Sequence, residues 1–273
     1  RPGLYGGHGR CGATGDAMLR RYPNTFYGVG PSASAEQEEE YTSRLGTLLV
    51  VVQRTIRPGW RFGPLLLVHA EEVTEVAEDG LLARDPVPGR AGGTTVGIGV
   101  ASRWDGRDNL YFPRRGRYLK LRGVVHHGRL GSDFAFARLV ADARRYVPVG
   151  SGGVLALNGY VEAVSGTAPF QLLPLLGGDD LMRGYREGRY RDRLLATLQA
   201  GYRFPLFGRV KGAVFANAGD VARRLDAFSL QGVKYAAGAG LRLRLNDEGL
   251  HGRVDYAIGP EGGALYVTLL EAF

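Results

Sequence analysis

The sequence predicts an all-β fold, an antiparallel transmembrane β-barrel of about 12 strands, or part of a barrel with about 16. Three observations favour this fold. Apolar and polar residues alternate with period two, the alternating segments are longer than strands of ordinary soluble domains, and the connections are mostly short and long in turn. No stretch of comparable length has the spacing of an amphipathic helix.

The alternation is clearest in the segment 233–246. Successive side chains of a strand point to opposite faces of a sheet, so the apolar residues share one face and the basic residues share the other. The apolar set is Val233, Tyr235, Ala237, Ala239, Leu241, Leu243 and Leu245, and the basic set is Lys234, Arg242 and Arg244. Segments 194–204, 209–219 and 250–258 repeat the pattern. An apolar outer band around a polar lumen accounts for this distribution.

Alternating segments of this kind fill most of the chain. They are about 10–14 residues long, whereas membrane-spanning strands need about 9–11 and soluble strands average about 5–6. We divide the chain into an N-terminal segment, 1–30, with room for one or two strands around NTFYGVG, and a barrel domain, 31–273. The predicted strands lie near 41–55, 59–72, 93–104, 117–128, 132–146, 152–165, 191–205, 209–219, 233–246, 249–258 and 263–273.

The connections between these segments give a second indication. Tight turns at 57–59, 150–153, 206–208 and 246–249 mostly alternate with long connections at 74–93, 166–190 and 220–231. Bacterial membrane barrels have short periplasmic turns and long extracellular loops. Two connections break the rule, the short 126–132 and the long 105–116. A soluble β-sandwich is the alternative fold, but its strands are shorter and its turns closer together.

Composition excludes several other classes of protein. The net charge of +8 is typical of nucleic-acid or anionic-lipid partners, but the arginines are spread over alternate strand positions, which argues against nucleic acid. The single cysteine, Cys11, excludes an internal disulfide and a cysteine metal site. The longest apolar runs, TLLVVV and PLLLV, are far shorter than the ~18 residues that a membrane-spanning helix needs.

Motifs for catalysis or cofactor binding are also missing from the sequence. It contains no nucleophile elbow, phosphate loop or calcium loop. The histidines do not have zinc spacing with a third ligand, and the adjacent His126 and His127 point to opposite faces of a strand. The five are His8, His69, His126, His127 and His251. We therefore expect no metal, no cofactor and no enzymatic activity.

Several short motifs, taken in order, resemble the bacterial surface antigen family, the barrel domains of BamA- and TamA-type outer-membrane assembly factors. They are YGVG followed by the acidic EEEY within 27–41, RDN..FP..G at 107–116, RGY at 183–185 and the terminal Phe273. The resemblance covers roughly residue 24 to the end. No single motif is specific to the family, but their order and spacing together are.

The resemblance implies that the 166–190 loop folds into the barrel lumen and carries its motif at Arg183, Gly184 and Tyr185. In the family, the arginine meets an acid on a nearby strand, in a stretch that here reads Phe215, Asn217, Gly219. Asn217 stands where the family has aspartate, and an amide offers only a neutral acceptor to a guanidinium. We therefore expect Arg183 to bind Asn217, with Asp220 as the alternative partner.

Two further groups of residues follow from the resemblance or from the strand pattern. A periplasmic turn motif comprises Arg107, Asp108, Asn109, Phe112, Pro113 and Gly116. The final stretch, GALYVTLLEAF, is typical of an outer-membrane insertion signal. We expect its apolar residues to share one face, namely Leu265, Val267, Leu269 and Phe273.

Three functions remain open at this point. The resemblance favours insertion of outer-membrane proteins, or translocation of polypeptides, through a lateral seam that has the last strand on one side. A passive pore and a membrane anchor for a passenger domain are the alternatives. The expected partners are outer-membrane lipid, unfolded outer-membrane or translocated polypeptides, and periplasmic accessory proteins. Residues 1–30 are too short for the family's periplasmic POTRA modules, so we expect a fragment, with a short natural member as the alternative.

Overall fold

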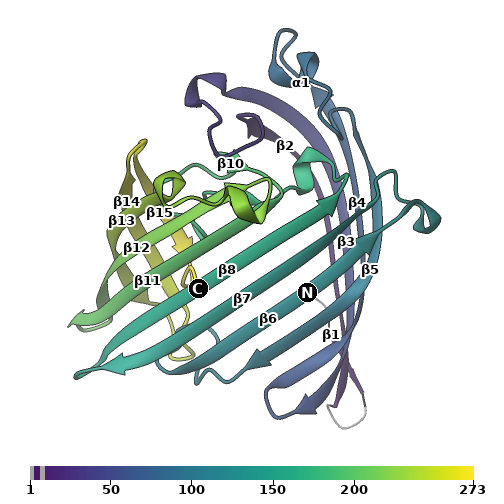
Figure 1. Cartoon of the computed structure of the whole chain (residues 1–273). Coiled ribbons are helices and arrows are strands. Elements are labelled where there is room, and N and C mark those ends of the chain that lie inside the picture. The colour runs from purple at the N-terminus through teal and green to yellow at the C-terminus, as the bar shows by residue number, and fades with distance from the viewer. Residues whose placement is uncertain (1–2, 7–9) are drawn as a thin grey trace.

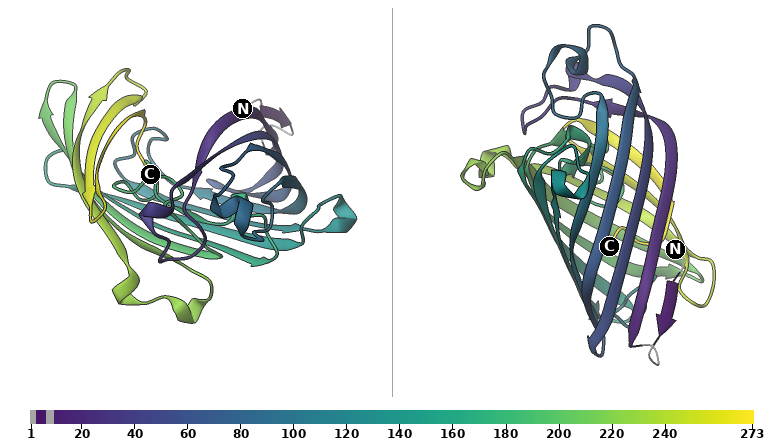
Figure 2. Two further views of the ribbon diagram at one scale, coloured as in Figure 1. Left: turned by 90° about the horizontal axis from the view of Figure 1, so that it is seen from above. Right: turned by 90° about the vertical axis from the view of Figure 1, so that its right-hand side faces the viewer.

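One large antiparallel sheet forms the molecule and curls around a lumen (Figure 1). The computed structural model describes residues 3–6 and 10–273. Within these residues, 13 strands pair with their neighbours in chain order, except that β9 and β10 form a separate two-stranded sheet. Seen from above, the sheet is a curved wall whose two edges, β1 and β15, lie apart (Figure 2), and no pairing joins them in the described part of the chain.

The strands of the large sheet are β1 (Gly3–Gly6), β2 (Cys11–Phe26), β3 (Glu39–Arg57), β4 (Trp60–Glu75), β5 (Gly92–Asp105), β6 (Gly116–His126), β7 (Phe136–Val149), β8 (Gly153–Gly166), β11 (Leu194–Phe207), β12 (Val210–Ala222), β13 (Lys234–Arg244), β14 (His251–Gly259) and β15 (Gly262–Leu269). The small sheet pairs β9 (Leu175–Leu176) with β10 (Tyr190–Arg191). The helices are short: α1 (Leu81–Arg84) and five 3-10 turns, η1 (Ala35–Gln37), η2 (Gly128–Leu130), η3 (Phe170–Leu172), η4 (Leu225–Ala227) and η5 (Leu230–Gly232). Across the described residues, no helix has the length and apolar character to cross a membrane.

The prediction of an all-β, antiparallel barrel fold is confirmed, and each of the eleven predicted strands after residue 40 matches one strand of the sheet. The strand expected near NTFYGVG is β2, which begins much earlier, at Cys11. The sequence predicted that the last strand runs to residue 273, but β15 ends at Leu269. The next residue, Leu270, has a φ of 68°, a left-handed conformation that a strand cannot continue through.

The two faces of the sheet have opposite chemical character, as the alternation predicted. On β13, the Tyr235 side chain is 64% exposed on the outside, whereas Arg242 is only 2% exposed on the lumen side. Large apolar side chains such as Leu198 and Val161 also lie exposed on the outer face, while Gln199 and Glu162 beside them are buried inside. A contiguous apolar outer face of this extent suits lipid, not water.

Candidate functional site

The long connection between β8 and β11, residues 167–193, lies within the curve of the sheet and contains η3, β9 and β10 (Figure 1). Its apolar side chains pack against inward-facing residues of the wall. One cluster joins Leu176, Met182, Tyr185 and Tyr190 of the loop to residues of three wall strands, Leu195, Val221 and Ala236. The charged loop is therefore a packed element of the lumen and is not a solvated surface loop.

Arg183 lies at the centre of this packed region. Its Nη1 atom donates to Oδ2 of Asp255 on β14 at 2.7 Å, and the two side chains are 2% and 0% exposed. The guanidinium also lies over the Phe215 ring of β12, 3.5 Å from the ring centroid. A buried guanidinium needs a hydrogen-bonded anion to offset its lost hydration, and Asp255 supplies that anion.

The expectation that Asn217 or Asp220 accepts from the Arg183 guanidinium was wrong. Asn217 instead donates from Nδ2 to the backbone oxygen of Arg183 at 3.1 Å. Asp220 forms an ion pair with Lys234 at 2.6 Å. The carboxylate that binds Arg183 lies on β14 and not on β12. Asp255 is an inward-facing residue of β14, and the short motif around Phe215 does not include that strand. The alternation of segment 250–258 had already placed Asp255 on the polar face, which was the signal that pointed to it.

Asp255 accepts from more than one arginine. Arg242 of β13 contacts both of its oxygens, with Nη2 at 3.3 Å from Oδ2, and Nε of Arg253 lies 3.8 Å from the same oxygen. Glu271 extends the cluster by accepting from Arg242 Nε at 3.1 Å. Burial lowers the pKa of Arg183, but an arginine begins so high that it stays charged at neutral pH.

The next two residues of the motif attach the loop to the last strands. Gly184 has a φ of 105°, and an added Cβ would come within 2.7 Å of the Ala236 Cβ, so this position requires glycine. Its N–H donates to the Tyr266 hydroxyl of β15 at 2.9 Å. The Tyr185 hydroxyl donates to the Tyr235 backbone oxygen at 3.3 Å. Arg183, Gly184 and Tyr185 thus hold the loop against β12 to β15.

Other arginines of the loop reach both edges of the sheet. Arg189 pairs with Glu261, in the β14–β15 turn, at 2.6 Å and donates to the Ala33 backbone oxygen, beyond β2, at 2.8 Å. Arg191 donates to the Thr25 backbone oxygen of β2 at 3.2 Å. Tyr190 donates to Glu261, and burial together with this acid raises the pKa of the Tyr190 phenol. The loop therefore bridges the gap between the β14–β15 turn and the end of β2, which is the outermost strand there because β1 pairs only with Cys11 to Thr14.

The connection between β5 and β6 turns inward at the opposite end of the barrel. Asn109 Oδ1 accepts from the backbone N–H groups of Tyr111 and Phe112, both at 2.8 Å, and Asp108 Oδ1 accepts from that of Arg114 at 2.9 Å. These bonds fix a compact turn. Gly116, with a φ of 117°, has no room for a Cβ because the Gly106 oxygen would lie 2.3 Å away.

Contacts across the lumen hold this turn in place. The Phe112 ring stacks on His251 of β14 with centroids 3.9 Å apart, and the Arg203 guanidinium of β11 lies 4.3 Å from the Phe112 centroid. Arg203 also donates to the Pro113 backbone oxygen. Within the turn, Arg107 pairs with Asp105 at 2.8 Å. The turn thus covers the end of the lumen at which the short turns lie.

Comparison with known proteins assigns the family. A model of the Omp85 superfamily domain matches residues 16–261, which is most of the chain. The chain belongs to the Omp85 superfamily. No curated protein sequence matches it. Among solved structures, BamA from Haemophilus ducreyi lacking POTRA domains 1–3 is similar with a TM-score of 0.69 and 14% identity, over 95% of this chain and 58% of that chain.

As an Omp85 barrel, the protein is located in the bacterial outer membrane. The Omp85 chain described here spans little more than half of the BamA chain that it resembles. The match to the Omp85 superfamily model confirms the family inferred from the sequence motifs. Because the identity to BamA is so low, that likeness shows the fold alone.

The final residues of this Omp85 barrel do not share one face. Leu265, Val267 and Leu269 point outward and are strongly exposed, but Phe273 is only 8% exposed and packs in the lumen against Tyr146. The prediction for Phe273 was therefore wrong. The left-handed Leu270 reverses the direction of the chain, and Glu271 then reaches the inward arginines Arg242 and Arg203.

Metal ligands do not gather anywhere in the part of the chain that the structure describes: no three His, Cys, Asp or Glu side chains could hold an ion together. His126, the last residue of β6, is buried and stacks on Phe136, while His127 follows the strand and is exposed. His8 lies outside the described residues.

Proposed function

We propose that this Omp85 barrel inserts outer-membrane proteins, or translocates polypeptides, through a lateral seam between β15 and the N-terminal strands. One observation carries the proposal: the sheet has two edges that pair with nothing among residues 3–6 and 10–273. An edge strand presents unpaired N–H and C=O groups, which hydrocarbon cannot satisfy. A substrate strand that adds to β15 by β-augmentation satisfies these groups.

The lumen loop acts as a latch across this seam in the proposed mechanism. Arg189 joins Glu261 at the β15 side to Ala33 on the other side, and Arg191 contacts β2. Arg183 anchors the loop to β14 through Asp255. Movement of the loop would release contacts at both edges together, so loop position and seam opening are coupled. Unfolded outer-membrane polypeptides and periplasmic accessory proteins are the partners that this mechanism calls for, and it uses no cofactor and no enzymatic turnover.

Site-specific photocrosslinking tests the seam. A photoreactive phenylalanine analogue at Leu265 of β15 is expected to crosslink to a barrel substrate that is stalled during insertion, because Leu265 lies on the free edge strand. The same analogue at Val161 of β8 is the matched control, since it is also apolar and lipid-exposed but lies on an interior strand. Equal crosslinking from both positions, or none from Leu265, would contradict the proposal.

Vesicle conductance separates this function from a passive pore. The intact chain is expected to give little steady conductance, because the 167–193 loop packs in the lumen. Replacing residues 175–191 with a short Gly-Ser linker should raise the conductance. The control replaces 223–232, a loop that contains the strongly exposed Leu225 and Leu230. Large porin-like currents from the intact chain would favour the passive pore.

A further inference from the structure

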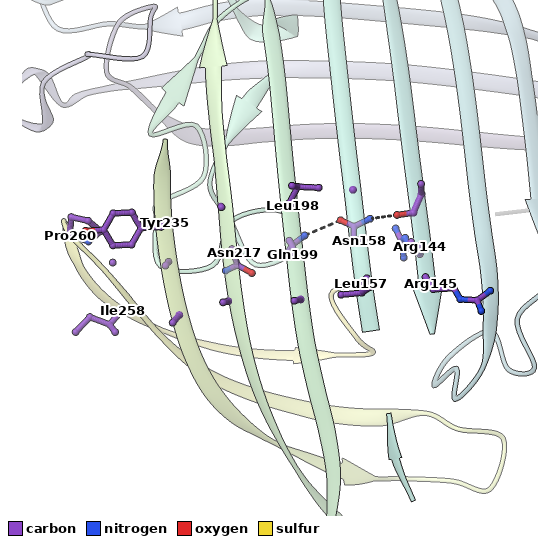
Figure 3. A pocket seen from close by; sticks show the side chains of 18 residues that line it. Arg144, Arg145, Leu157, Asn158, Leu198, Gln199, Asn217, Tyr235, Ile258 and Pro260 are labelled. Atoms are coloured by element: carbon purple, nitrogen blue, oxygen red, sulfur yellow. Dashed lines mark hydrogen bonds between the residues drawn. The ribbon is translucent and has the colours of Figure 1, made fainter. Parts of the chain in front are cut away.

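A shallow apolar groove of about 1060 Å³ crosses the outer face of strands β7 to β14 (Figure 3). Strand register explains its shape. Ala200, Ala216 and Ala237 are direct neighbours on three successive strands, and all three point outward. Larger side chains, among them Leu198 and Tyr235, rise on one side of this row of alanines. Small residues in line between large ones leave a channel on a surface that faces lipid.

A pair of arginines stands at one end of the groove. The alanine row continues through Leu157 to Arg145 on β7, and Arg145 is directly opposite Arg117 on β6. Both arginines are exposed on the outer face, and neither side chain has an ion pair or hydrogen bond with any residue that the structure describes. Like charges directly opposite each other in a sheet are destabilising unless an anion lies between them.

The arginine end of the groove lies toward the periplasmic side of the wall. Arg145 and Arg117 lie near the short-turn, periplasmic ends of β7 and β6, whereas Ile258 at the far end of the row lies beside the β14–β15 turn at the opposite rim. Five inter-strand steps separate Arg145 from Ile258, or about 24 Å at about 4.8 Å per step.

We propose that this surface binds an anionic phospholipid of the periplasmic leaflet, with its phosphate between Arg117 and Arg145 and one acyl chain along the groove. The charge of the two arginines indicates which ligand fits the groove. Two arginines match a phosphate, which offers several acceptor oxygens to their planar donor groups. Apart from Tyr235 and Pro260, the other outward side chains of the groove are alanine, glycine and aliphatic residues, which match a hydrocarbon chain. The polar lining residues Asn158, Gln199 and Asn217 are buried on the lumen side.

Tryptophan quenching by brominated lipid measures the lipid preference. The chain has two tryptophans, Trp60 and Trp104, which are cross-strand neighbours on the outer face, and Trp104 is next to Leu119, two residues from Arg117. The protein is reconstituted in phosphatidylcholine vesicles with a minor share of phosphatidylglycerol, and either lipid carries the bromine. We expect brominated phosphatidylglycerol to quench beyond its share of the bilayer. In R117Q/R145Q, this preference should fall by about five-fold for each arginine removed.

Matched variants make the test decisive. Arg209→Gln removes an exposed arginine at the same end of the barrel but away from the groove, and it should keep the preference. Ala200→Phe fills the groove and should lower the preference, whereas Ala141→Phe, outside the groove on the same strand as Arg145, should not. An unchanged preference in R117Q/R145Q, an equal loss in Arg209→Gln, or no effect of Ala200→Phe would overturn the proposal. Heat-modifiable gel mobility shows that each variant has folded.

Discussion

Replacement of Asp255 by asparagine is expected to lower the unfolding free energy of the barrel by about 3–5 kcal/mol. The substitution preserves the shape of the side chain and removes only its charge. Arg183, Arg242 and Arg253 all lie within 4.0 Å of this carboxylate, and all three are almost completely buried. Without the anion, three guanidinium groups face one another in a region with little access to water.

Urea unfolding of the barrel in lipid vesicles measures this loss. Asp226→Asn is the control, because Asp226 also pairs with an arginine, Arg224 at 2.8 Å, but on the connection between β12 and β13, where both side chains are exposed. A surface pair of that kind contributes about 0–1 kcal/mol. If both variants lose equally little stability, Asp255 does not hold the lumen cluster together.

A double-mutant cycle then identifies the partner of Arg183. Alanine at Arg183 and asparagine at Asp255 should couple strongly, since each removes the same ion pair. Arg183→Ala and Asn217→Ala should couple weakly, because Asn217 bonds to the backbone oxygen of Arg183, which alanine retains. Strong coupling to Asn217 with none to Asp255 would reverse this assignment.

Leu241→Arg is expected to cost about 2–4 kcal/mol of stability in a bilayer, because the new charge would face hydrocarbon near the membrane midplane. Leu241 is exposed on the outer face of β13. It lies about five residues before the tight turn that begins at Asn246, which is half of a membrane span of about 9–11 residues.

Unfolding in vesicles compares this variant with Leu245→Arg. Leu245 is also exposed, but it adjoins the turn, where an arginine reaches the interface and costs about 0–1 kcal/mol. The difference in unfolding free energy between Leu241→Arg and Leu245→Arg should disappear in a detergent micelle, because water can approach the side chain there. Equal losses at both positions would show that depth in a bilayer does not govern them.

The sequence by itself determined the secondary structure, the two faces of the wall and the family. Each of these depends on local pattern. Period two places Tyr235 outside and Arg242 inside whatever the neighbouring strands are, because the direction of a side chain follows from the strand backbone. The order of the motifs correctly predicted between which strands the lumen loop lies, and the alternation correctly predicted that Asn217 and Asp255 face inward.

Only the tertiary structure decided which inward groups meet. Arg183 could reach acids on several strands, and the choice of Asp255 depends on where the loop crosses the lumen, which Gly184 and Tyr266 help to fix. Likewise, the period-two pattern predicted that Phe273 points outward, but the left-handed backbone at Leu270 directs it inward. The groove beside Arg145 became visible only through the register of six strands. Contacts between residues far apart in the chain depend on strand register and on the path of the loop. Neither can be predicted from the local alternation of residues.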